Sequence, residues 1–116
     1  MKMLEITLEL KDTILDTFKM DKDEITIGRN SANDITIDNL AVSDRHARIV
    51  RDKTGYYLED LKSTNGTMVD GRKITRIGLV GRQEITIGKH TLDVQLTEKK
   101  GAGSDFARTM KIDRSR

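Results

Sequence analysis

The stretch EITIGKHTLDVQL, residues 84–96, carries the pattern that decides the fold. Apolar side chains occupy every second position on both sides of a short segment, Gly88 to His90, that has the composition of a turn. Alternation with a period of two is typical of a strand that buries one face, and glycine is a frequent turn residue. This stretch therefore predicts two strands joined by a turn.

The same alternation recurs toward the N-terminus of the chain. Its apolar positions are Leu4, Ile6, Leu8 and Leu10, then Ile25 and Ile27, then Ile35 and Ile37. Turn-like segments separate these runs, and no segment before the C-terminal tail keeps a helical period. Regularly spaced short strands with turn signals between them indicate a sandwich or barrel, so we expect an all-β fold of antiparallel strands.

The length of 116 residues favours a single domain. From Gly101 the composition changes to that of a linker, so we expect a domain at residues 1–98 and a flexible tail at 99–116. The absence of cysteine excludes disulfides and thiolate metal sites. No run approaches the roughly 18 apolar residues of a membrane span, and no signal-peptide pattern opens the chain. We therefore expect a cytoplasmic location and no membrane partner.

The charge is nearly balanced, with a net value of +2. The residues after Lys100 hold four basic and two acidic side chains, which account for the whole excess. Proteins that bind nucleic acid usually combine a basic domain with stacking aromatic residues, and aromatic residues are only 3% of this chain. We expect no nucleic-acid partner, and any anion site must be local.

Three short segments at predicted turns carry groups suited to holding one phosphate on a peptide. They are Gly28-Arg29, Ser43-Asp44-Arg45-His46 and Ser63-Thr64-Asn65-Gly66-Thr67. Arg29 supplies a permanently charged, planar donor fork, while Ser43 and Thr64 supply hydroxyl donors. Each segment alone has a simpler explanation, because Asn65-Gly66 is a common hairpin-turn pair and surface arginines are frequent. Their occurrence together favours a phosphate site.

These residues, in this order, resemble the forkhead-associated (FHA) domain family. The resemblance covers residues 3–97, and the residues that carry it are Ile27-Gly28-Arg29, Asn33-Asp34-Ile35, Val42-Ser43-Asp44-Arg45-His46-Ala47, Leu58-Glu59-Asp60, the run from Ser63 to Gly71, and Gly88. It implies an eleven-stranded antiparallel β-sandwich whose loops at one end bind phosphothreonine in a partner protein. The function implied is a phosphothreonine-dependent binding module in kinase signalling.

The resemblance also implies roles for single residues. Arg29, Ser43 and Thr64 would contact the phosphate, and Asn65 the main chain of the peptide. His46 would tie the loops together by hydrogen bonds, with Gly28 and Gly66 as further structural support, and Arg45 and Lys62 would be secondary contacts. One position departs from the commonest family pattern. Asp44 stands where an arginine or another donor often occurs, so either it points away, paired with Arg45, or it weakens phosphate binding.

Other functions remain open in the sequence. A phosphate-independent assembly domain of the same fold is the alternative to a phosphothreonine module. We expect no enzyme, because Ser43 and His46 lack an identifiable third orienting group and oxyanion hole. We also expect no cofactor and no metal site, since the two histidines have no metal-ligand spacing. Thr109 lies in a basic stretch and, once phosphorylated, could occupy the site of another copy, so self-association is a further possibility.

Overall fold

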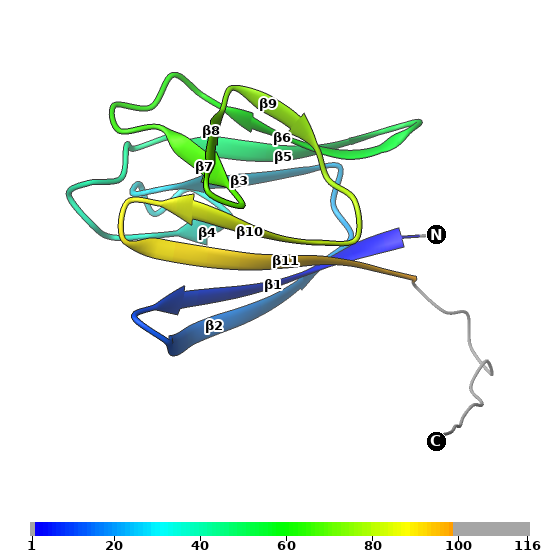
Figure 1. The fold of residues 1–116 in the computed structure, drawn as a ribbon, viewed down its shortest axis with the longest axis horizontal. Helices are drawn as coiled ribbons and strands as arrows, with labels where there is room; N and C mark the ends of the chain where they lie inside the picture. Colours follow the sequence, from blue (N-terminus) through cyan, green and yellow to red (C-terminus); the bar gives the residue numbers. More distant parts are fainter. Residues whose placement is uncertain (1, 99–116) are drawn as a thin grey trace.

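The computed structural model describes residues 2–98, which form two β-sheets around one apolar core (Figure 1). The six-stranded sheet has the order β2-β1-β11-β10-β7-β8, and the five-stranded sheet has the order β4-β3-β5-β6-β9. The predicted all-β sandwich of eleven strands is therefore confirmed. The strands are β1 (Lys2–Leu10), β2 (Thr13–Met20), β3 (Glu24–Gly28), β4 (Ile35–Thr36), β5 (Ala47–Asp52), β6 (Gly55–Asp60), β7 (Thr67–Val69), β8 (Arg72–Ile74), β9 (Arg76–Gly78), β10 (Arg82–Ile87) and β11 (His90–Glu98).

The alternating apolar positions pair across neighbouring strands on the inner faces. Strands β1 and β11 are antiparallel, and their register sets Ile6 opposite Val94 and Leu8 opposite Leu92. All four side chains are buried. Because the side-chain period of a strand is two, this register sends the polar residues between them to the outer face. The alternation in residues 84–96 therefore arises because each strand buries one face, as predicted.

One pair of strands differs from the expected antiparallel arrangement. Strands β3 and β4 run parallel, with Ile27 opposite Ile35. Residues 29–34 fold back far enough for the Asp34 carboxylate to accept a hydrogen bond from the Thr26 amide at 2.9 Å. The chain then runs forward beside β3. Ile35 and Ile37 are both buried in the core after this detour.

Strand β2 has only a short alternating apolar pattern, at Phe18 and Met20, which pack against the core. It is the edge of the six-stranded sheet, and most of its side chains are exposed, including Ile14 and Leu15. The turn that joins it to β1 consists of Lys11 and Asp12, whose φ values are 50° and 65°. Two residues with positive φ form the hairpin turn whose twist matches that of the strands, which favours the pairing of β2 with β1.

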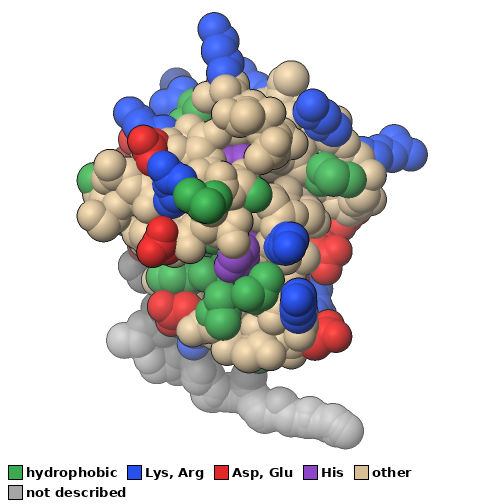
Figure 2. All heavy atoms as spheres, turned by 90° about the vertical axis from the view of Figure 1, so that its left-hand side faces the viewer, with side chains coloured by type: hydrophobic (Ala, Val, Ile, Leu, Met, Phe, Trp, Pro, Cys, Tyr) green, Lys and Arg blue, Asp and Glu red, His purple; other side chains and the backbone are tan. Residues whose placement is uncertain are grey.

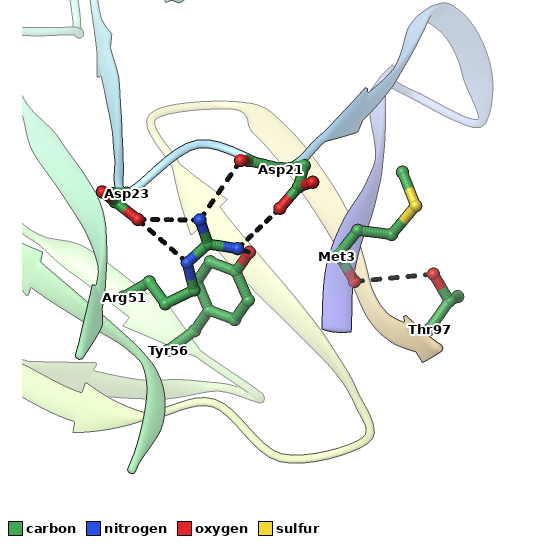
Figure 3. A network of polar contacts seen from close by, with 6 residues as sticks. All are labelled: Met3, Asp21, Asp23, Arg51, Tyr56 and Thr97. Carbon is green, nitrogen blue, oxygen red and sulfur yellow. Dashed lines mark hydrogen bonds and ion pairs between the residues drawn. The ribbon is translucent and has the colours of Figure 1, made fainter. Parts of the chain in front are cut away.

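Three long loops lie at one end of the sandwich, and a polar network around Arg51 lies at the other. The loops of residues 29–34, 37–46 and 61–66 gather at the end shown on the left of Figure 1. At the other end, the Arg51 guanidinium donates hydrogen bonds to the carboxylates of Asp21 and Asp23 and to the Tyr56 hydroxyl (Figure 3). These two carboxylates raise the pKa of Arg51. The network joins the β2–β3 connection to the β5–β6 hairpin, away from the loops.

The expected tail at residues 99–116, with Thr109, lies outside the described residues. Within residues 2–98, no helix has the length and apolar character of a membrane span.

Candidate functional site

The three segments singled out in the sequence meet at the loop end of the sandwich, and Ser43 joins them. Its carbonyl oxygen accepts a hydrogen bond from the Arg29 amide at 2.9 Å, at the end of β3. Its hydroxyl oxygen accepts one from the Thr64 amide at 3.0 Å, in the β6–β7 loop. Backbone and side chain of one residue therefore connect the other two segments.

Gly28 allows two stretches of backbone to touch. A Cβ atom at this position would lie 2.2 Å from the carbonyl oxygen of Asp44 and 2.8 Å from the amide nitrogen of the Asn33 side chain. That Asn33 amide donates hydrogen bonds of 2.7 Å to the carbonyl oxygens of Asp44 and Asn30. Only a residue without a side chain fits this contact. The position of the segment 43–45 beside β3 therefore depends on Gly28 and Asn33.

The ring of His46 connects two loops from a fully buried position. Its Nδ1 accepts a hydrogen bond from the Ser43 amide at 3.1 Å, and its Nε2 lies 2.8 Å from the carbonyl oxygen of Gly66. A carbonyl oxygen only accepts, so Nε2 carries the proton and Nδ1 is the acceptor. The ring is thus neutral, with both nitrogens used to hold Ser43 and Gly66 in relative position.

Asp60 organises the β6–β7 loop, a role that the sequence did not reveal to us. Its carboxylate accepts hydrogen bonds from the hydroxyls of Ser63 at 2.6 Å and Thr67 at 2.7 Å. Burial alone would raise the pKa of Asp60, but these hydrogen bonds outweigh it and hold the pKa below its usual value. The Ser63 hydroxyl oxygen in turn accepts from the Gly66 amide at 2.9 Å, where Gly66 has a φ of 87°.

Asn65 links its loop to the neighbouring one. The amide of its side chain donates a hydrogen bond of 2.9 Å to the carbonyl oxygen of Ala41. The side chain is exposed, and a carboxamide has two donor hydrogens and an acceptor oxygen. The Ala41 contact uses one donor, which leaves the oxygen and the second hydrogen for a ligand.

Asp44 pairs with Arg29 and not with Arg45. Its Oδ1 atom lies 3.5 Å from the Nε of Arg29, with side-chain exposures of 68% for the aspartate and 37% for the arginine. Of the two alternatives given for Asp44, the one in which it points away, paired with Arg45, is therefore wrong. The reason is the contact at Gly28, which brings the backbone of Asp44 directly beside the end of β3, where Arg29 begins the next loop.

Two hollows open at this end. The first, of about 280 Å³, is lined by four of the predicted contacts together with part of the β4–β5 loop: Arg29, Ser43, Thr64 and Asn65, with Leu40, Ala41, Val42 and Asp44. The second, of about 510 Å³, is lined by Thr26, Asn30, Ala32, Asn33, Asp44 and Arg45. Lys62 is exposed in the β6–β7 loop, with a φ of 56°, and lines neither.

Apolar and charged groups both reach the surface here. Leu40 is 90% exposed on the rim of the first hollow. Figure 2 shows this face of the molecule, with basic side chains spread around it and acidic ones among them. The charge is thus mixed over the face. The described chain has a larger hollow of about 570 Å³, but that one lies at the opposite end, beside Arg51 and Tyr56.

Comparison with known proteins places these features in a family. The family model described as "FHA domain" matches residues 25–88. The chain is 36% identical over 75 residues to the oxoglutarate dehydrogenase inhibitor of Corynebacterium jeikeium, covering 65% of this chain and 52% of that one. The chain therefore spans about half the length of this curated relative.

Solved structures agree with the architecture. Mycobacterium tuberculosis EmbR in complex with a low affinity phosphopeptide superposes with a TM-score of 0.75 at 27% identity, covering 86% of this chain and 26% of that one. A chain from a structural and functional analysis of phosphothreonine-dependent FHA domain interactions gives a TM-score of 0.72 at 28% identity, covering 82% and 99%.

Proposed function

This chain belongs to the FHA domain family, and from that premise we propose that it is a non-catalytic module that binds threonine-phosphorylated proteins in kinase signalling. The observation that carries the proposal is the hollow of about 280 Å³ in which Arg29, Ser43, Thr64 and Asn65 come together. The domain is proposed to span residues 1–98 and to act in the cytoplasm, as the sequence led us to expect.

The phosphate would be held by three of these residues. A phosphothreonine carries a charge of about −1.5 to −2 at pH 7 and three strong acceptor oxygens. Arg29 supplies the positive charge and its N–H donors. The hydroxyl oxygen of Ser43 already accepts from the Thr64 amide, so its own proton is free to be donated to a phosphate oxygen. The Thr64 hydroxyl supplies a further donor at the same hollow.

Asn65 would hold the main chain of the peptide. The groups left after its bond to Ala41 are one donor and one acceptor, which match the N–H and C=O of a peptide backbone. Arg45 and Lys62, both exposed, would contact residues that flank the phosphothreonine. His46, Gly28 and Gly66 act indirectly, by fixing where Ser43 and the β6–β7 loop lie.

The expected affinity is modest. A charge-assisted hydrogen bond contributes about 1.5–3 kcal/mol, and two or three of them, reduced by desolvation of the phosphate, correspond to micromolar binding. Binding of this strength is readily reversible, which suits a partner whose phosphorylation changes. One similar structure points the same way, since it was solved with a low affinity phosphopeptide.

The test is binding of one degenerate peptide library prepared with phosphothreonine, phosphoserine or unmodified threonine. We expect wild type to retain the phosphothreonine pool and Arg29→Ala to lose it, with little change in thermal stability, because a surface ion pair such as that of Arg29 with Asp44 contributes little to folding. Arg72→Ala, an exposed arginine on β8, is the matched control and should bind like wild type. Equal retention of all three pools by wild type would instead favour a phosphate-independent assembly domain of the same fold.

A further inference from the structure

The carboxylate of Asp44 lies beside Arg29, the cation of the hollow that would receive a ligand anion. Its Oδ1 atom lies 3.5 Å from the Nε of Arg29, and Asp44 lines the same hollow as Ser43 and Thr64. An acid at this position is unexpected for an anion site. It gives Arg29 a partner of the same chemical class as the charged ligands that the hollow would receive.

The position of Asp44 is fixed by its backbone. Its carbonyl oxygen accepts hydrogen bonds from the Asn33 side chain at 2.7 Å and from the Asn30 amide at 3.3 Å. The backbone of Gly28 lies against the same carbonyl group. Asp44 therefore cannot leave the site by a shift of the main chain. Its side chain is exposed, so a rotation about its own torsions can take the carboxylate away from Arg29.

We propose that Asp44 is an affinity-determining residue of the site, a built-in carboxylate that competes with the phosphate of the ligand for Arg29. The inference rests on the proposed function. In the free domain Asp44 neutralises Arg29 and holds its guanidinium at the hollow. An arriving phosphate has to displace the carboxylate, and it then binds with a negative charge close by.

Competition by Asp44 acts on every anion. The Arg29–Asp44 pair has no net charge, so it attracts an anion much less than an unpaired arginine would. A ligand must then gain its binding energy from short-range hydrogen bonds. A phosphate has three oxygens to share among Arg29, Ser43 and Thr64, whereas a carboxylate has two. Acidic segments without phosphate consequently gain little from this site, and phosphopeptides bind weakly enough to exchange.

The test compares wild type with Asp44→Asn, which keeps the shape of the side chain and removes its charge. Asp38→Asn is the matched control, because Asp38 is an exposed carboxylate in the same loop that does not line the hollow. Calorimetry measures the binding of one phosphothreonine peptide, of its unmodified form, and of the same peptide with glutamate in place of phosphothreonine. The measurements are made at about 50 mM and about 0.5 M salt, since a charge effect is screened at the higher concentration.

We expect Asp44→Asn to bind the phosphothreonine peptide about three- to tenfold more tightly than wild type at low salt. Binding of the glutamate peptide should also rise, the advantage should shrink at high salt, and Asp38→Asn should match wild type. Thermal melting checks that the variant folds, and Asp44→Ser replaces it if it does not. Binding by Asp44→Asn alone, with wild type too weak to measure, also supports competition.

Two other outcomes overturn the inference, and they are distinguishable. If wild type binds the phosphothreonine peptide and Asp44→Asn binds it no better, or gains no more than Asp38→Asn, Asp44 is not a competitor while the proposed function stands. If neither wild type nor Asp44→Asn binds the phosphothreonine peptide in preference to its unmodified form, the proposed function fails and the inference fails with it.

Discussion

Replacing His46 by alanine tests how strongly one ring holds the loops together. The ring is fully buried, and its two nitrogens bond to the amide of Ser43 and the carbonyl of Gly66. Alanine leaves two backbone groups without these partners, at about 1–3 kcal/mol each where water cannot replace them, and also leaves a cavity. We expect the free energy of unfolding to fall by about 3–5 kcal/mol, a large part of the roughly 5–15 kcal/mol of a typical domain.

His90→Ala provides the matched control for His46→Ala. His90 is 7% exposed, and its Nδ1 has no hydrogen-bond partner among the described residues. Its removal costs packing without breaking a bond at Nδ1, so we expect a loss smaller by at least about 2 kcal/mol. Urea unfolding followed by circular dichroism measures both variants. Equal losses would refute the argument that the two hydrogen bonds, and not the volume of a buried ring, make His46 important.

Three further outcomes follow from the site. Gly28→Ala should lower both the melting temperature and phosphopeptide affinity, because the new Cβ would meet the Asp44 carbonyl at 2.2 Å, whereas Gly78→Ala has open space and should melt like wild type. Burial raises the pKa of Asp60, but its hydrogen bonds lower it by more, so the pKa is lower in the folded than in the unfolded protein. The ionised carboxylate therefore stabilises the fold at a pH above the pKa of an unfolded aspartate, and this stabilisation is lost as the pH falls below about 4. Asp60→Asn should flatten that acid limb of the stability curve, and an unchanged slope would contradict the assignment. Affinity for the phosphothreonine peptide should fall as the pH drops through about 6, where the phosphate dianion takes up a proton and becomes a monoanion, and a flat profile would argue against recognition of a dianion.

The sequence predicted those parts of the fold that follow from local alternation. The buried faces of β1 and β11 could be assigned because the apolar residues Ile6 and Leu8, and then Leu92 and Val94, repeat every second residue. Strand β2 could not be recognised in this way, because as an edge strand it leaves most of its side chains exposed. The parallel pairing of β3 with β4 depends on the fold-back of six residues, which no local pattern encodes.

The sequence was enough to predict which residues form the site, but not which of them contact one another. Arg29, Ser43 and Thr64 could be proposed because phosphate requires a cation and hydroxyl donors. The pairing of Asp44 with Arg29 joins two loops separated in sequence, so it exists only once Gly28 has brought them together. The Asp60 network has a sequence signal in the spacing of an acid three residues before a serine, which is a frequent turn pattern, but such pairs occur in many loops.

The first and last described strands lie side by side, with Lys2 opposite Glu98, at the end of the sandwich away from the loops (Figure 1). An attachment made at Lys2 or at Glu98 would therefore leave the hollow at Arg29 facing outward. A fluorophore or biotin joined there would not block the hollow. A sensor chip to which the domain is coupled at that end would present every copy in the same orientation. The same geometry lets the unit be spliced between two segments of a longer polypeptide, because its entrance and exit are neighbours.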